Sequence, residues 1–180
     1  MPAALYYSRE MVLALPEDGN RYETVWGELL VTPAPRLRHQ EVLKRLLVQL
    51  ELYLRAEPVG RVLPSPADIS WGPDILVQPD LFVVAREQAG ATEWSQVTRL
   101  LFVVEVLNPS SVRADRYTKR KLYQSHGVGT YWAVDPDAEM VEVWSPEAAF
   151  PAVERDRVAW HPAGAREPLV IELAELFRPT

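Results

Sequence analysis

Residues Val77–Val84 (VQPDLFVV) and Leu101–Leu107 (LFVVEVL) form two short apolar runs, and each run carries one acidic residue. Both runs are rich in β-branched residues and are bounded by turn formers, which is typical of strands buried on both faces. The acidic residues are Asp80 and Glu105. A carboxylate in such a strand is costly unless it is paired or bound to a cation. If the strands are neighbours, the two carboxylates predict a metal site with oxygen ligands.

The segments around these runs predict an α/β fold. Apolar residues recur at helical spacing over residues 39–56, and His39 falls on the same face as Leu43 at the N-terminal end of this helix. A second helix is expected over residues 115–126, before a strand at 130–134. A helical crossover between positions 107 and 130 makes the strands it joins parallel. We therefore expect a central mixed β-sheet flanked by helices.

Length and composition are those of an ordinary globular protein. The 180 residues are expected to form a single domain over residues 1–180, with 48% hydrophobic and 24% charged residues. The absence of cysteine excludes disulfides, thiolate metal sites and a cysteine nucleophile. No apolar run approaches the roughly 20 residues of a membrane span, and no signal-peptide pattern stands at the N-terminus, so a cytoplasmic protein is expected. The net charge of −6 argues against a general nucleic-acid coat protein.

The residue types alone leave two interpretations of the acidic pair open. Asp80 and Glu105 suit Mg²⁺ or Mn²⁺, which prefer carboxylate, carbonyl and water oxygens. The alternative is that Asp80 begins a turn and that Glu105 faces solvent at a strand end. Lys119 follows Glu105 closely and could orient an attacking water or stabilise developing charge. It could equally form a helix-surface ion pair with Asp115 at i, i+4.

The order and spacing of several short motifs resemble the Uma-two-type restriction endonuclease family of the PD-(D/E)XK phosphodiesterase superfamily. The similarity extends from about residue 9 to the Leu-Ala-Glu-Leu-Phe tail. The matching segments are Tyr22–Leu29, His39–Gln40, Val77–Asp80, Val104–Ser111, Asp115–Tyr123 and Gly127–Pro136.

The resemblance implies a restriction-endonuclease-like fold and a set of site residues. Asp80 matches the superfamily's proline–aspartate element, and Glu105 matches its second acid. The superfamily usually has a lysine two residues after that acid, but this chain has Leu107 there. The resemblance assigns the lysine role to Lys119 instead. His39 also matches a family position, as a metal ligand, phosphate ligand or proton acceptor, although a core histidine is the alternative.

Glu28 lies in the Gly27–Leu29 segment and is a further candidate, because it could approach the site from a hairpin. The alternative is an exposed acid on an edge strand.

Together these features predict a metal-dependent endonuclease that uses Mg²⁺ or Mn²⁺ and hydrolyses phosphodiester bonds, with DNA as the expected partner. The catalytic set is Asp80, Glu105, Lys119, His39 and Glu28. The alternative function is an inactive nucleic-acid-binding or protein-interaction module on the same fold. A homodimer is also expected, from one site per chain and an apolar hairpin near Trp132 and Trp144.

Overall fold

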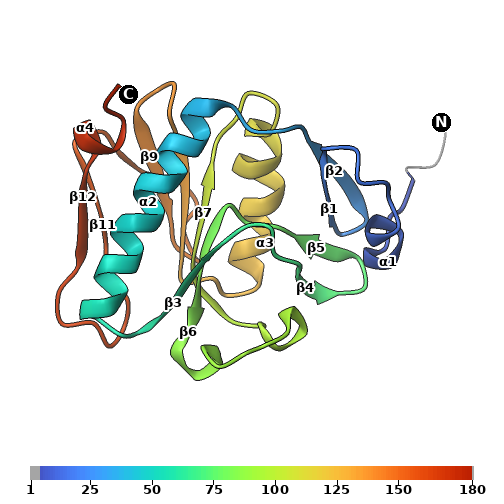
Figure 1. Ribbon diagram of the computed structural model, residues 1–180, viewed down its shortest axis with the longest axis horizontal. Coiled ribbons are helices and arrows are strands. Elements are labelled where there is room, and N and C mark those ends of the chain that lie inside the picture. Colours follow the sequence, from blue (N-terminus) through green and yellow to red (C-terminus); the bar gives the residue numbers. More distant parts are fainter. Residues whose placement is uncertain (1–4, 180) are drawn as a thin grey trace.

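A six-stranded mixed sheet forms the centre of the computed structural model, which describes residues 5–179 (Figure 1). Its strand order is β10-β9-β8-β7-β6-β3. Neighbouring strands run antiparallel except β7 and β8, which are parallel as the sequence predicted. The strands are β3 (Gly60–Pro64), β6 (Leu81–Ala85), β7 (Leu100–Val106), β8 (Thr130–Asp135), β9 (Met140–Trp144) and β10 (Ala152–Glu154).

The crossover between β7 and β8 is helical, but its first half is not an α-helix. Residues Ala114–Lys119 form a π-helix, η3, which continues directly into α3 (Arg120–Ser125). The expected helix over 115–126 is therefore present with a wider first turn. π-Helical turns are rare and are concentrated at functional sites.

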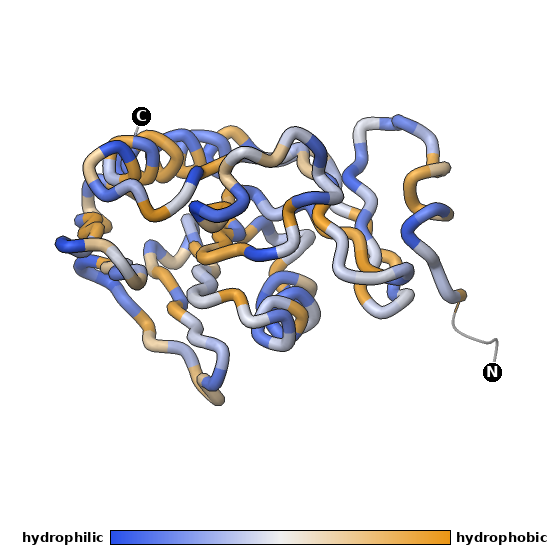
Figure 2. Tube along the Cα trace, turned by 90° about the horizontal axis from the view of Figure 1, so that it is seen from below, coloured by the Kyte–Doolittle hydropathy of each residue, from blue (hydrophilic) through white to orange (hydrophobic). Residues whose placement is uncertain are grey.

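Helices cover both faces of the central sheet. On one face, α2 (Leu37–Ala56) packs Leu46 and Leu50 against Phe102 and Val104 of β7. Val103 lies between these two β7 residues in the sequence, and it belongs to the apolar cluster on the opposite face, where α3 lies. Figure 2 shows α2 and α3 on opposite sides of the sheet, each with polar and apolar residues interleaved along the helix. Glu105 alternates with Val104, so its side chain points to the α3 face.

A smaller antiparallel sheet, ordered β2-β1-β5-β4, lies at one end of the molecule beside α1 (Arg9–Leu13) (Figure 1). Its hairpin turns at Trp26 and Gly27, which have φ angles of 51° and 80°. Two consecutive positive φ values are typical of a tight hairpin turn, and glycine adopts them without strain. The strands are β1 (Arg21–Val25), β2 (Glu28–Thr32), β4 (Ile69–Gly72) and β5 (Ile75–Val77).

The expectation of one strand across residues 77–84 is wrong. β5 belongs to the smaller sheet and β6 to the central sheet, and the segment Gln78–Asp80 connects them. Pro79 has no N–H to donate to a strand ladder, and the N–H of Gln78 donates to the side chain of Glu23 instead. The break places Asp80 at the start of β6, where the two sheets meet.

The C-terminal part completes the core on the α2 face with a hairpin of β11 and β12, followed by α4. Trp132 and Trp144 are 0% and 7% exposed, so the hairpin that motivated the predicted homodimer is covered within the chain itself.

None of the helices within residues 5–179 has the length and apolar character that a membrane span requires. The remaining elements are β11 (Arg157–Trp160), β12 (Leu169–Glu172), α4 (Leu173–Leu176), and the 3₁₀ turns Arg86–Gln88 and Trp94–Gln96.

Candidate active site

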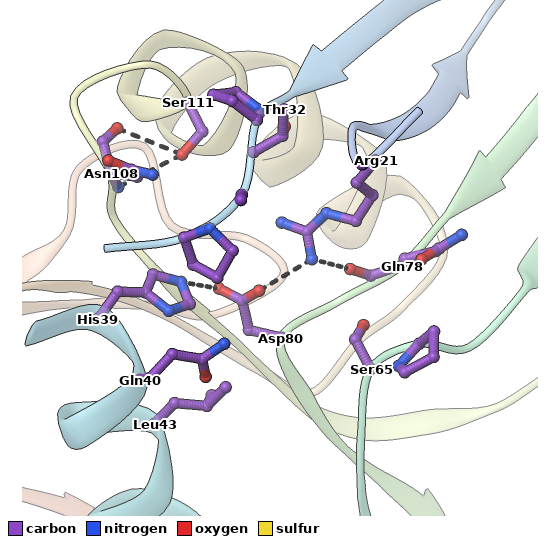
Figure 3. A pocket seen from close by; sticks show the side chains of 15 residues that line it. Arg21, Thr32, His39, Gln40, Leu43, Ser65, Gln78, Asp80, Asn108 and Ser111 are labelled. Carbon is purple, nitrogen blue, oxygen red and sulfur yellow. Dashed lines mark hydrogen bonds and ion pairs between the residues drawn. The ribbon is translucent and has the colours of Figure 1, made fainter. Parts of the chain in front are cut away.

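Asp80 is held by hydrogen bonds from three different elements. Its Oδ2 accepts from the backbone N–H of Val106 at 2.9 Å and lies 3.1 Å from His39 Nε2. Its Oδ1 accepts from Arg21 Nη1 at 2.9 Å (Figure 3). Only 4% of Asp80 is exposed. The break between β5 and β6 thus aims this carboxylate at the end of β7 and at the first turn of α2.

Glu105 lies beside Asp80, as the sequence predicted. Its Oε2 is 3.4 Å from the backbone N of Asp80, which donates to it, while the N–H of the following residue, Val106, donates to Asp80. These two contacts join β6 and β7 at the position of both acids. Glu105 Oε1 accepts from Tyr123 at 2.7 Å and from Lys119 at 3.0 Å.

Lys119 is buried among three carboxylates. Its Nζ lies 3.0 Å from Glu105, 2.9 Å from Glu23 and 3.5 Å from Asp115. The π-helix η3 brings Asp115 and Lys119 to its inner side, facing β7. Lys119 therefore reaches Glu105 from the following helix, and not from the strand that carries Glu105.

Glu23 belongs to this cluster, although it was not among the predicted site residues. It is 0% exposed, and its Oε1 accepts from the N–H of Gln78 at 2.7 Å. The available signal was an acid at the middle of a short, loosely alternating strand. Glu28 was predicted in its place, but Glu28 is an exposed residue at the first position of β2, next to the hairpin turn. The hairpin contributes its acid from β1 and not from β2.

Arg21 is a second site residue that was not predicted. Its Nη1 donates to the carbonyl oxygen of Gln78 at 3.0 Å as well as to Asp80. Its Nε lies 3.8 Å from Glu23. Its side chain is 21% exposed, so it forms the boundary between the buried carboxylates and solvent.

His39 occupies the predicted position in the first turn of α2. It is 7% exposed, and its Nε2 faces Asp80. Its Nδ1 is buried and has no hydrogen-bond partner within residues 5–179. The histidine is therefore bound to a site carboxylate and not to a backbone carbonyl, which was the alternative for a core histidine.

A cavity of about 240 Å³ opens beside Asp80, and Arg21 and His39 line it (Figure 3). Gln40 from α2 and Ser111 from the loop after β7 are among the other polar residues that line it. Residues 33–35, between β2 and α2, contribute an apolar rim. The cavity gives a ligand access to Asp80, whereas Lys119 is 1% exposed and lies behind it.

The buried charges do not balance. Four buried carboxylates face two permanently charged cations, Arg21 and Lys119, which leaves two excess negative charges if every carboxylate is ionised and His39 is neutral. Uncompensated buried charge is costly. Either protonation or a divalent cation would remove the excess. The four carboxylates are those of Glu23, Asp80, Glu105 and Asp115.

The pKa shifts reflect this imbalance. Burial raises the pKa of Glu105 to about 8, despite the opposing charge of Lys119. Burial opposes ionisation of Asp80 too, but the hydrogen bond from His39 and the charge of Arg21 outweigh it and lower the pKa of Asp80. Burial alone would lower the pKa of Lys119, but Glu105, Glu23 and Asp115 raise it. Lys119 is therefore a charged hydrogen-bond donor and Asp80 an ionised carboxylate at neutral pH.

The donor set suits a hard divalent cation, although the carboxylates are not arranged as a ready-made cage. Across residues 5–179, no group of three or more His, Asp or Glu side chains is arranged to hold a metal ion. Lys119 and Arg21 already occupy the oxygen atoms of the acids. The oxygen donors and the excess negative charge nevertheless match what Mg²⁺ or Mn²⁺ requires.

The mixed sheet, the flanking helices and the acidic strand ends define an α/β protein of the restriction-endonuclease-like fold class. Residues 9–173 match the model of the Uma2 family, which is described as "Putative restriction endonuclease", and the chain belongs to this family. The motifs that suggested this family therefore identified it correctly.

One solved structure supports the fold. It is described as a "putative nuclease belonging to DUF820" from Anabaena variabilis, and it is similar with a TM-score of 0.78 and 22% sequence identity. The alignment covers 95% of this chain and 97% of that one. At this identity the likeness establishes the fold. No curated protein matches the chain.

Proposed function

We propose that this protein is a divalent-metal-dependent endonuclease that hydrolyses phosphodiester bonds in DNA. The observation that carries the proposal is that Glu105 contacts both the ammonium of Lys119 and the backbone N–H of Asp80, whose side chain borders a solvent-accessible cavity. Membership of the Uma2 family favours a nuclease. The excess of buried carboxylate over buried cation favours a Mg²⁺ or Mn²⁺ partner.

In this proposal, Asp80 and Glu105 hold the metal, and Glu23 supports them from β1. When bound, a divalent cation polarises a phosphoryl oxygen and lowers the pKa of a bound water. Lys119 cannot act as a base, because the surrounding carboxylates raise its pKa. It instead orients the attacking water or stabilises the negative charge that develops on the phosphate.

His39 positions Asp80 through its Nε2 and leaves Nδ1 without a partner in residues 5–179. That nitrogen is suited either to accept a proton from the attacking water or to donate a hydrogen bond to a phosphate oxygen. The first role needs a neutral ring, and the second needs a proton on Nδ1.

Cleavage assays with labelled single-stranded, double-stranded and branched DNA, with and without Mn²⁺ or Mg²⁺, test the proposal. The wild type should cut at least one substrate only when the metal is present. Asp80→Asn should weaken both Mn²⁺ binding and cleavage, because it removes the ionised ligand. RNA substrates in the same panel test the preference for DNA.

The alternative is a binding module without turnover, and one observation favours it: Lys119 and Arg21 already pair with the carboxylates in the absence of metal. A wild-type protein that binds nucleic acid but leaves the whole panel uncut at saturating Mn²⁺ would establish this alternative.

A further inference from the structure

Arg21 places a cationic nitrogen between two oxygen atoms of the kind that bind divalent metals. Its Nη1 donates to the carboxylate of Asp80 at 2.9 Å and to the backbone carbonyl of Gln78 at 3.0 Å (Figure 3). Carboxylate and carbonyl oxygens are characteristic ligands of Mg²⁺ and Mn²⁺. The guanidinium thus compensates the charge of Asp80 and uses an oxygen that a cation would need.

Both carboxylate oxygens of Asp80 already have hydrogen-bond partners. Its Oδ2 is bound by the backbone N–H of Val106 and faces His39, and its Oδ1 is bound by Arg21. The Val106 N–H belongs to a central strand and cannot withdraw without breaking the sheet. A cation that binds both Asp80 Oδ1 and the carbonyl oxygen of Gln78 must displace the Arg21 Nη1 that bridges these two atoms.

Among the groups bound to Asp80, Arg21 has the most freedom to move. Its side chain is 21% exposed, whereas that of His39 is 8% exposed. Arg21 also lines the cavity of about 240 Å³, so its guanidinium can turn into open space without leaving the site. A long side chain with several rotatable bonds can make this movement while its backbone stays in β1.

The cavity is equipped to receive an anion once Arg21 turns into it. His39 lines it with a buried Nδ1 that has no partner in the part of the chain described, and Ser111 and Gln40 contribute further polar groups. Arginine binds phosphate through two parallel N–H···O bonds, which gives both affinity and orientation. A phosphate group of a nucleotide is the anion that fits this chemistry.

From these contacts we infer that Arg21 is an exchangeable residue: it occupies Asp80 while no metal is bound, and it binds a substrate phosphate in the adjoining cavity once a divalent cation takes its place. This inference rests on the proposed nuclease function. It assigns Arg21 two opposite effects, because the guanidinium weakens the binding of the metal and strengthens the binding of the substrate.

Binding measurements on Arg21→Met separate these effects without relying on cleavage. Methionine keeps an apolar stem and removes the guanidinium. Mn²⁺ titration by calorimetry should show a Kd lower by about 10- to 100-fold than in the wild type, since the competing ion pair is gone. In the presence of Mn²⁺, the Kd of a dinucleotide with a non-hydrolysable methylene phosphonate linkage should rise by about 10- to 100-fold.

Two further variants make the comparison specific. Arg21→Lys keeps a cation beside Asp80 but loses the fork, so its Mn²⁺ affinity should stay near that of the wild type while dinucleotide binding weakens. Arg45→Met is the matched control, because Arg45 is a similarly buried arginine, 15% exposed, that pairs with Glu41 and with two backbone carbonyls outside the cavity lining. It should change neither affinity.

The inference is overturned if Arg21→Met binds Mn²⁺ no more tightly than the wild type, or if its dinucleotide affinity is unchanged. Wild-type protein that binds Mn²⁺ and cleaves DNA would leave the proposed function standing in that case. If neither protein binds Mn²⁺, both the inference and the metal-dependent function are refuted.

Discussion

The buried carboxylates and their cationic partners form two halves, and both halves pair acids with cations. The outer half borders the cavity, whereas the inner half is sealed from solvent. At the outer half, Asp80 faces Arg21, His39 and a cavity. At the inner half, Lys119 lies among Glu23, Glu105 and Asp115, and each of these four residues is at most 2% exposed. We infer that partners at the outer half exchange for a ligand, whereas those at the inner half are fixed by packing. In the proposed function, this difference separates the residues that bind metal and substrate from those that hold a permanent charge in place.

Lys119→Met gives the sharpest test of the inner half. Methionine keeps much of the apolar stem but removes the charge, so cleavage should fall by about 10²–10⁴-fold. Mn²⁺ binding should persist, because the ammonium is not a metal ligand. Without metal, the unpaired carboxylates should lower the free energy of unfolding by about 3–5 kcal/mol. Labelled-DNA assays, calorimetry and urea unfolding measure the three effects.

Lys121→Met is the control for this variant. Lys121 is an exposed residue two positions further along the chain, in α3, which continues directly from η3. It should leave cleavage unchanged. Equal cleavage by the Lys119→Met and wild-type proteins would remove Lys119 from the proposed reaction.

Glu23→Gln and Glu28→Gln compare two acids of one hairpin. Glu23 is buried, binds Lys119 and accepts from the N–H of Gln78, so its neutral variant should cut about 10- to 100-fold more slowly. Glu28 is exposed, and its variant should change stability by no more than about 0.5 kcal/mol. A larger rate loss for Glu28→Gln than for Glu23→Gln would restore the role that the sequence suggested for Glu28.

The stability of the metal-free protein should depend on pH through Glu105. Burial raises the pKa of this residue to about 8 from an ordinary value of 4.5, so in that interval the folded state keeps a proton that the unfolded state releases. The free energy of unfolding should therefore fall as pH rises from about 5 to 8, by up to about 1.4 kcal/mol per pH unit.

Two comparisons check this assignment. Glu105→Gln should flatten the pH dependence in urea unfolding curves measured from pH 5 to pH 8. Asp80 acts in the opposite direction, because its pKa is lowered, and its contribution is lost only as pH falls below its ordinary value of 3.8. A wild-type stability that rises between pH 5 and pH 8 would contradict the proposed protonation of Glu105.

Tyr123→Phe should produce the smallest effect. Tyr123 donates a 2.7 Å hydrogen bond to Glu105, and burial raises its pKa well above the ordinary value, so it stays a donor across the usable pH range. Losing this bond should cost about 1–2 kcal/mol of stability and reduce cleavage less than 10-fold. A loss as large as that of Lys119→Met would mean that Tyr123 contributes directly to the reaction.

Sequence patterns predicted the central sheet, the parallel pair β7–β8 and the long helix α2, because each depends on local periodicity and on the handedness of a helical crossover. They also indicated that Asp80 and Glu105 would meet, since buried strands cannot hold isolated carboxylates. His39 was placed by its helical phase relative to Leu43, and the structure shows it against Asp80.

Tertiary structure decided which other residues join these acids. Glu23 and Arg21 lie on β1, and only the pairing of β1 with β5 brings them to Gln78 and Asp80. The pairing of β1 and β2 around the hairpin turn determines that Glu23, and not Glu28, points to the site. The sequence by itself determined most of the central elements and the acidic pair, because these follow from local periodicity and from the cost of burying charge. Only the tertiary structure decided the charge balance, because it depends on contacts between residues far apart in the chain.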